Sequence, residues 1–208
     1  GAVATKAFYE KLVAWAKTYE VGVVSDLAYG ALGYQGYENP SFLSTPGAKD
    51  VGIEFYTFSK TFNMAGWRLA FAAGNDQMIE ALNLIQDHLF VGIFPALQEA
   101  GIAALLDPKS EEAVAQLNAT YDSRRDAFVQ AAAKIGWQAF PSRGSFYAWM
   151  PVPEGYTSES FADLLLEKVH VAVAPGKGFG PAGDAYVRIG LLVEPERLVE
   201  AVDRIANL

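Results

Sequence analysis

Cysteine is absent from the 208-residue sequence, and histidine occurs only at His88 and His170. Without cysteine, disulfide scaffolds, cysteine-ligated zinc and thiol catalysis are excluded. The two histidines stand far apart in the sequence, which argues against a histidine-rich metal site and against a Ser-His-Asp triad. We therefore expect no bound metal.

Long hydrophobic runs and a leader-like start are also missing. No apolar run approaches the ~20 residues that a membrane helix needs. The first residues, Gly1–Thr5, have neither the basic region nor the long apolar core of a secretory signal peptide. The sequence thus predicts a protein of a reducing compartment, which we take to be the cytoplasm, with no membrane partner.

Positive charge is scarce, because 16 Lys and Arg stand against 24 Asp and Glu and give a formal net charge of −8. This balance argues against a nucleic-acid partner and against binding to an anionic membrane surface. Hydrophobic residues make up 51% of the chain and charged residues only 19%, which is typical of a globular protein. The length allows one large domain or two small ones.

Helix and strand patterns alternate along the chain, which predicts the α/β class. Thr5 is suited to cap a first helix that has Phe8, Leu12 and Trp15 on one face. A long helix is predicted at about 110–135. Short apolar runs predict strands at 21–24, 53–58, 69–73, 138–140, 146–150, 171–174 and 186–191.

The predicted elements fall into two parts. Residues 1–118 have the pattern of a mostly parallel sheet, and residues 119–208 that of a smaller α+β unit, with the long helix joining them. Residues 27–50 are rich in Gly, Tyr, Pro and Ser and predict a loop. A loop of that length is unusual in a compact domain, which indicates a functional role.

A glycine string near the C-terminal end matches a nucleotide-binding pattern only by its letters. Gly178-x-Gly180-x-x-Gly183 fits the dinucleotide fingerprint, but that fingerprint needs a helix N-terminus directly after it. Here Pro181 interrupts and an extended segment, Tyr186–Ile189, follows. We therefore interpret the string as a turn between two strands.

Polar side chains follow two neighbouring predicted strands. Thr57 and Lys60 lie at the end of one strand, with Arg68 eight positions after the lysine. Asp26 ends the preceding strand, and Tyr29 comes three residues later. In open α/β sheets, ligands bind at the carboxyl ends of the strands. A lysine here is either a surface residue or an amine held in a site, and the neighbouring hydroxyl, guanidinium and carboxylate groups favour the second.

The segment Ser59–Arg68, SKTFNMAGWR, resembles the signature of the class I/II aminotransferases, which are fold-type-I enzymes dependent on pyridoxal phosphate. Further segments resemble other elements of that family in the same order, namely Val23–Tyr29, Gly144–Trp149, Pro175–Gly180 and Tyr186–Ile189. The resemblance implies a fold-type-I transferase, here the latter part of the large pyridoxal phosphate-binding domain (1–118) and the small C-terminal domain (119–208).

The resemblance also implies a role for each candidate residue. Lys60 would form the internal aldimine with pyridoxal phosphate and act as the general acid/base for the proton shift. Asp26 would pair with the protonated pyridine nitrogen, and Tyr29 would donate to the ring phenolate oxygen. Thr57 and Arg68 would hold the phosphate, since planar guanidinium donors suit that geometry.

Arg188 would hold the substrate carboxylate in the same family pattern. Strand alternation places it on the face opposite Val187 and Ile189. From the residues alone, an arginine that faces water is an equal interpretation. A charge-assisted pair is worth ~1.5–3 kcal/mol, which is enough to orient a small amino acid.

The function implied is an aminotransferase that moves an amino group between an L-amino acid and a 2-oxo acid, as a homodimer in its full-length form. Two alternatives stay open. The same residues would serve a carbon-sulfur β-lyase, and the fold would also serve a non-catalytic, effector-binding module. The sequence does not identify the amino acid.

Family elements expected upstream of Gly1 have no counterpart in the sequence. They are the asparagine of an Asn-Pro-x-Gly element, the phosphate-binding loop and the aromatic residue that stacks on the cofactor ring. The resemblance is therefore to a C-terminal portion. We expect these 208 residues alone to bind pyridoxal phosphate weakly and to turn over poorly.

Overall fold

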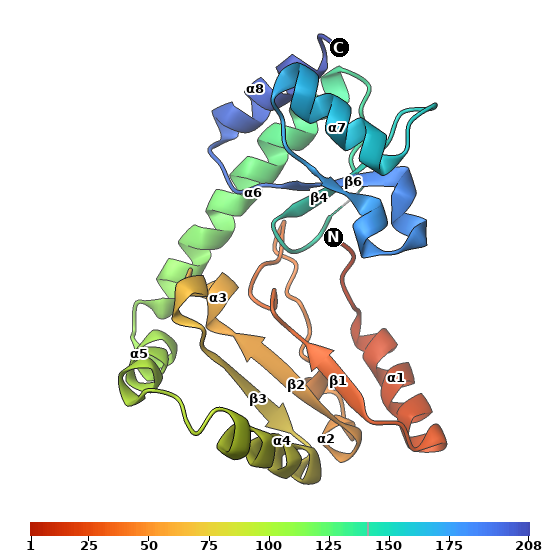
Figure 1. The fold of residues 1–208 in the computed structure, drawn as a ribbon. Helices are drawn as coiled ribbons and strands as arrows, with labels where there is room; N and C mark the ends of the chain where they lie inside the picture. Colours follow the sequence, from red (N-terminus) through yellow and green to blue (C-terminus); the bar gives the residue numbers. More distant parts are fainter. Residues whose placement is uncertain (141) are drawn as a thin grey trace. The chain divides into compact units, whose positions relative to one another are not determined.

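The computed structural model describes residues 1–140 and 142–208. The chain divides into two compact units (Figure 1). We call Val3–Leu117 the first unit, and Gly1–Ala2 with Asn118–Leu208 the second unit. The helix α6, Ser110–Lys134, begins in the first and ends in the second. Within the described part of the chain, none of the helices is both long and apolar enough to span a membrane.

A three-stranded sheet forms the centre of the first unit, in the order β1-β2-β3. Its strands are β1 (Val23–Asp26), β2 (Gly52–Thr57) and β3 (Ala70–Gly74). β1 runs parallel to β2, whereas β3 runs antiparallel to it. Because β1 and β2 are parallel, their carboxyl ends lie at the same edge of the sheet (Figure 1).

The first helix, α1 (Lys6–Tyr19), begins as predicted but buries another face. Thr5 caps it, since the Thr5 hydroxyl accepts from the Phe8 N–H at 3.2 Å. Of the apolar residues on the predicted face, Phe8 is 53% and Trp15 48% exposed, whereas Leu12 packs against the core of the unit. The residues that are buried instead are Tyr9, Val13 and Ala16. The helix is apolar on more than one side, so that periodicity alone did not decide which side meets Phe42 and Ala48.

The remaining elements of the first unit are short or lie after the sheet. The predicted loop at 27–50 is irregular up to a 3₁₀ turn, η1 (Phe42–Ser44), and the start of α2 (Ala48–Val51). Next along the chain are α3 (Phe58–Thr61), η2 (Ala65–Trp67), α4 (Asp76–Leu89) and α5 (Pro95–Leu106).

The second unit contains an antiparallel sheet in the order β4-β6-β5. Its strands are β4 (Tyr147–Pro151), β5 (Ala174–Pro175) and β6 (Tyr186–Gly190), and its other helices are α7 (Ser158–Val169) and α8 (Pro195–Ile205). Phe128, Leu165 and Val187 belong to the buried core that these helices and the sheet share.

The strand predicted at 138–140 is wrong. Phe140 donates a backbone hydrogen bond to the Trp149 carbonyl at 2.9 Å, but the segment has no strand assignment. One such bond beside β4 is not a ladder, so a short apolar run was over-interpreted.

The glycine string lies in two 3₁₀ turns, η3 (Gly176–Phe179) and η4 (Pro181–Ala185), directly before β6. Gly180 has φ +122°, a conformation that favours glycine. A Cβ on Gly183 would lie 2.1 Å from the Gly176 carbonyl oxygen. The glycines therefore serve turn geometry and close backbone approach, and no α-helix follows them that would bind a pyrophosphate.

Candidate functional site

Lys60 lies on α3, immediately after the carboxyl end of β2. Thr57 caps this short helix, because its hydroxyl accepts from the Ser59 N–H at 3.1 Å. Phe58 and Thr61 are the buried residues of the helix and anchor it to the unit. Lys60 itself is half-buried, and its Nζ lies 5.9 Å from the centroid of the Tyr29 ring. The amine is thus held on a fixed turn beside an aromatic ring.

Asp26 is the last residue of β1 and lies at the same edge of the sheet as α3. It pairs in register with Phe55 of β2, and the Leu27 N–H donates to the Phe55 carbonyl at 2.9 Å. The Asp26 side chain is exposed. A carboxylate, a phenol and an amine therefore come from the ends of two adjacent parallel strands.

Arg68 ends the loop that returns from α3 to β3. The Leu69 carbonyl accepts from the Phe58 N–H at 3.2 Å and lies 3.3 Å from the Thr57 hydroxyl, which closes the loop. Arg68 has φ +54°, and its guanidinium is exposed, with Nη1 donating to the Ala65 carbonyl at 3.0 Å. The loop thus returns the backbone next to Arg68 to the end of β2, where the Thr57 hydroxyl lies.

Gly101, which the sequence analysis did not single out, lies against this loop. A Cβ there would lie 2.6 Å from Leu69 Cδ2 and 3.2 Å from the Phe58 ring. α5 therefore packs directly on Leu69, the neighbour of Arg68, and on Phe58, two residues before Lys60. The signal in the sequence was a glycine inside a helical pattern, which indicates close packing but not the partner.

Arg188 lies in the second unit, on the face of β6 opposite the buried Val187 and Ile189. Its guanidinium carbon is 4.0 Å from the Tyr147 ring centroid and 4.1 Å from the Phe179 ring centroid. Two aromatic rings at this distance fix the plane of a guanidinium through cation–π contacts. The donors at the guanidinium edge stay available for a carboxylate.

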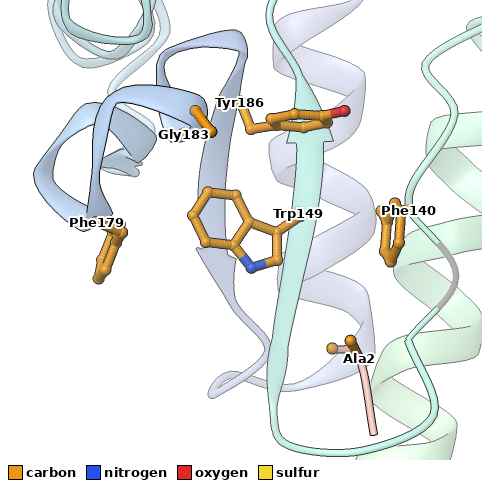
Figure 2. Close-up of a pocket in the computed structure, with 8 residues that line it drawn as sticks. Ala2, Phe140, Trp149, Phe179, Gly183 and Tyr186 are labelled. Carbon is orange, nitrogen blue, oxygen red and sulfur yellow. The ribbon is translucent and has the colours of Figure 1, made fainter.

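A pocket of about 390 Å³ opens on the same face of this sheet, with aromatic walls that include Phe140 and Tyr186 (Figure 2). Trp149 lines it and is the register partner of Arg188 on β4. Phe179 lines it as well, and its ring centroid lies 5.5 Å from that of Trp149. This face of the second unit, and not the one against the core, can therefore receive a ligand.

Hydrogen bonds to α7 fix the loop that carries Phe179. The Ser158 hydroxyl donates to the Asp184 carboxylate at 2.7 Å and accepts from the Lys177 N–H at 3.2 Å. The bonds from Ser158 lower the pKa of Asp184. The Lys177 ammonium pairs with Glu159 at 2.6 Å, a hydrogen bond that raises the pKa of Lys177. The positive charge of Lys177 is thus paired with a carboxylate of α7.

The groups at the end of the first sheet fit pyridoxal phosphate by their chemistry. An amine suits its aldehyde, and a carboxylate suits a protonated pyridine nitrogen. Hydroxyl and guanidinium donors suit a phosphate. The structure places Asp26, Tyr29, Thr57, Lys60 and Arg68 in the first unit, whereas Arg188 belongs to the second.

Comparison with known proteins gives the family. Residues 1–205 match the sequence profile "Aminotransferase class I and II". An L-glutamine–4-(methylsulfanyl)-2-oxobutanoate aminotransferase of Bacillus subtilis is 57% identical, over 100% of this chain and 52% of that protein. An LL-diaminopimelate aminotransferase of Moorella thermoacetica is 46% identical, over 100% of this chain and 53% of that protein.

Solved structures of the same kind superpose closely on the chain. Substrate-bound BacF of Bacillus subtilis has a TM-score of 0.94 at 45% identity, over 99% of this chain and 52% of that one. An aminotransferase of Staphylococcus aureus has a TM-score of 0.95 at 39% identity, over 100% of this chain and 55% of that one. The chain spans about half the length of these relatives.

Proposed function

The chain belongs to the class I and II aminotransferase family, and we propose that the full-length protein transfers an amino group between an L-amino acid and a 2-oxo acid. The observation that supports this proposal most strongly is the Lys60 amine, 5.9 Å from the Tyr29 ring, at the sheet edge where β1 also ends in Asp26. The relatives named above are all aminotransferases, which favours amino transfer over a carbon-sulfur lyase.

Pyridoxal phosphate, when bound, supplies an electron sink for negative charge at the substrate α-carbon. In our proposal, Lys60 Nζ would hold the cofactor through its aldehyde carbon. Once the substrate amino group had displaced it from that carbon, the free amine would take the proton from the substrate α-carbon. The turn capped by Thr57 fixes the backbone from which the Lys60 side chain extends. Arg68 and the Thr57 hydroxyl bind the phosphate.

Asp26 and Tyr29 act on the ring itself. The Asp26 carboxylate pairs with the ring nitrogen and favours its protonated form. The Tyr29 phenol donates to the ring oxygen. Arg188 binds the substrate carboxylate, since its guanidinium is oriented by two aromatic rings and the strength of such a pair depends on that orientation.

Two relatives guide the choice of substrates to assay. The relative at 57% identity is named for L-glutamine and 4-(methylsulfanyl)-2-oxobutanoate, and the relative at 46% identity is named for LL-diaminopimelate. We propose the first pair for this protein. The full-length enzyme should form methionine from that oxo acid and L-glutamine. Release of a thiol with ammonia and pyruvate from a cysteine conjugate, without amino transfer, would instead establish the lyase.

The proposal includes a homodimer, supported by an apolar segment between α4 and α5. Leu89, Phe90, Val91 and Phe94 are 70%, 67%, 87% and 69% exposed. Monomeric proteins rarely leave contiguous apolar patches of this kind in water, and the interfaces of homodimers are more apolar than the remaining surface.

A charge-introducing double variant tests the dimer. Phe90→Glu with Phe94→Glu in the full-length protein should give the mass of a monomer in light scattering, because two carboxylates in an apolar interface would lose their hydration. Leu166→Glu is the matched control, since Leu166 is 52% exposed on α7. Retention of the dimer mass by the double variant would contradict the proposed interface.

A further inference from the structure

The loop between β1 and η1 carries Tyr29, and its conformation depends on one side chain further along. The Asn39 Nδ2 lies 3.3 Å from the Tyr29 carbonyl oxygen, 3.2 Å from that of Gly30 and 3.1 Å from that of Leu32. A side-chain amide has two N–H donors, so the three acceptors share them. The Asn39 amide thus bonds to three carbonyls of the turn that carries Tyr29.

The segment around Asn39 is itself anchored to the sheet. The Glu54 carboxylate, 7% exposed on β2, accepts from the Ser41 hydroxyl at 2.5 Å and from the Phe42 N–H at 2.7 Å. It also accepts from the Ser25 hydroxyl on β1 at 3.0 Å. These bonds tie Ser41 and Phe42, which follow Asn39 closely in the chain, to the sheet.

Tyr29 in turn lies beside the amine of the site. Its ring centroid is 5.9 Å from Lys60 Nζ. A further bond, from the Leu32 N–H to the Tyr29 carbonyl at 2.9 Å, shapes the same turn. A displacement of the turn would therefore move the phenol relative to the amine.

We infer that Asn39 is a positioning residue, whose amide sets where the Tyr29 phenol meets the cofactor ring. The inference rests on the proposed function, because it needs Tyr29 to contact the cofactor. It assigns to Asn39 no contact with cofactor or substrate. Its effect passes through the carbonyls of the turn and then through Tyr29.

The test uses the full-length protein and the variant Asn39→Asp, which keeps the shape but lacks N–H donors and repels carbonyl oxygens. Asn75→Asp is the matched control, because the Asn75 amide also bonds two carbonyls, those of Lys49 and Asp50, at 3.3 and 3.1 Å. An aspartate at 75 still caps α4. Asn39→Ala removes the donors without adding charge and serves if the aspartate variant does not fold.

Two quantities decide the outcome, the dissociation constant for pyridoxal phosphate and the pH midpoint of the bound cofactor's visible absorbance. In Asn39→Asp we expect about tenfold weaker binding, the loss of roughly one such hydrogen bond. We also expect a midpoint shift in the same direction as in Tyr29→Phe. In the cofactor-free protein, amide hydrogen exchange at Gly30 and Leu32 should become faster. Asn75→Asp should change none of these.

The possible failures are distinct. If Tyr29→Phe moves the midpoint and both Asn39 variants leave it at the parent value, the inference is overturned and the proposed function stands. If Tyr29→Phe moves neither quantity, the proposed role of Tyr29 fails, and the inference fails with it. If Asn75→Asp moves the midpoint as far as Asn39→Asp, the effect is a general loss of stability, which also overturns the inference.

Discussion

A Lys60→Ala variant of the full-length protein should lose the visible absorbance of bound pyridoxal phosphate and remain folded. The substitution removes the amine that the proposal joins to the cofactor aldehyde. It also removes the base that we propose for the α-carbon, and a positioned acid or base typically contributes ~10²–10⁴-fold to a rate. We therefore expect turnover to fall by at least roughly that factor, measured as product formed from L-glutamine and 4-(methylsulfanyl)-2-oxobutanoate.

The fold should tolerate this change because α3 is held by other residues. Phe58 and Thr61 are buried, and the Tyr56 and Thr61 hydroxyls lie 2.7 Å apart. Thermal unfolding of Lys60→Ala should stay within a few degrees of the parent, since a substitution outside the core usually changes stability by about 0.5 kcal/mol or less.

Lys49→Ala is the matched control, because Lys49 is an exposed lysine of the same unit. It should keep both the absorbance and the turnover. Borohydride reduction of the parent with pyridoxal phosphate, followed by peptide mapping, should label Lys60. A label on another lysine, or a coloured Lys60→Ala protein, would contradict the assignment of the amine.

The family and the fold class could be predicted from the sequence and are confirmed. The decisive signal was local, because the ten consecutive residues Ser59–Arg68 carry the family resemblance by themselves. The edge where β1 and β2 end was also predictable, because both strands are short apolar runs that end in polar residues. The roles of the individual site residues stay predictions.

The errors share a physical cause. The sequence left the buried face of α1 undecided, because Phe8 and Trp15 are as apolar as the residues that are buried. Tertiary contact with Phe42, and not the helical period, decides between the two faces. Asn39 was missed because a bond from a side chain to loop carbonyls leaves no periodic trace in a sequence. Side-chain contacts that follow no helical or strand period were therefore the part that the sequence did not predict.

The second large effect is expected at Arg188, where the shape of the cation should matter as well as its charge. Arg188→Lys keeps a positive charge but loses the planar group that lies between Tyr147 and Phe179, 4.0 and 4.1 Å from their ring centroids. It also loses the paired donors that suit a carboxylate. A charge-assisted pair is worth ~1.5–3 kcal/mol, so its loss in the variant should raise KM roughly 10–100-fold.

The increase should appear for both the amino acid and the 2-oxo acid, because both carry the carboxylate that we propose Arg188 binds. The loss of kcat should be smaller, since the carboxylate is bound equally in the ground state and the transition state. Phe179→Leu, which removes one ring, should raise KM by a smaller factor, as a cation–π contact contributes about 0.5–2 kcal/mol.

Arg204→Lys is the control for these steady-state measurements. Arg204 lies on α8 in the same unit and pairs with Glu200 on the surface. Its variant should keep the parent KM values. An Arg188→Lys enzyme with unchanged KM for both substrates would show that the carboxylate is bound elsewhere. The two aromatic rings would then be packing around a structural arginine, and the second unit would not supply the substrate anchor.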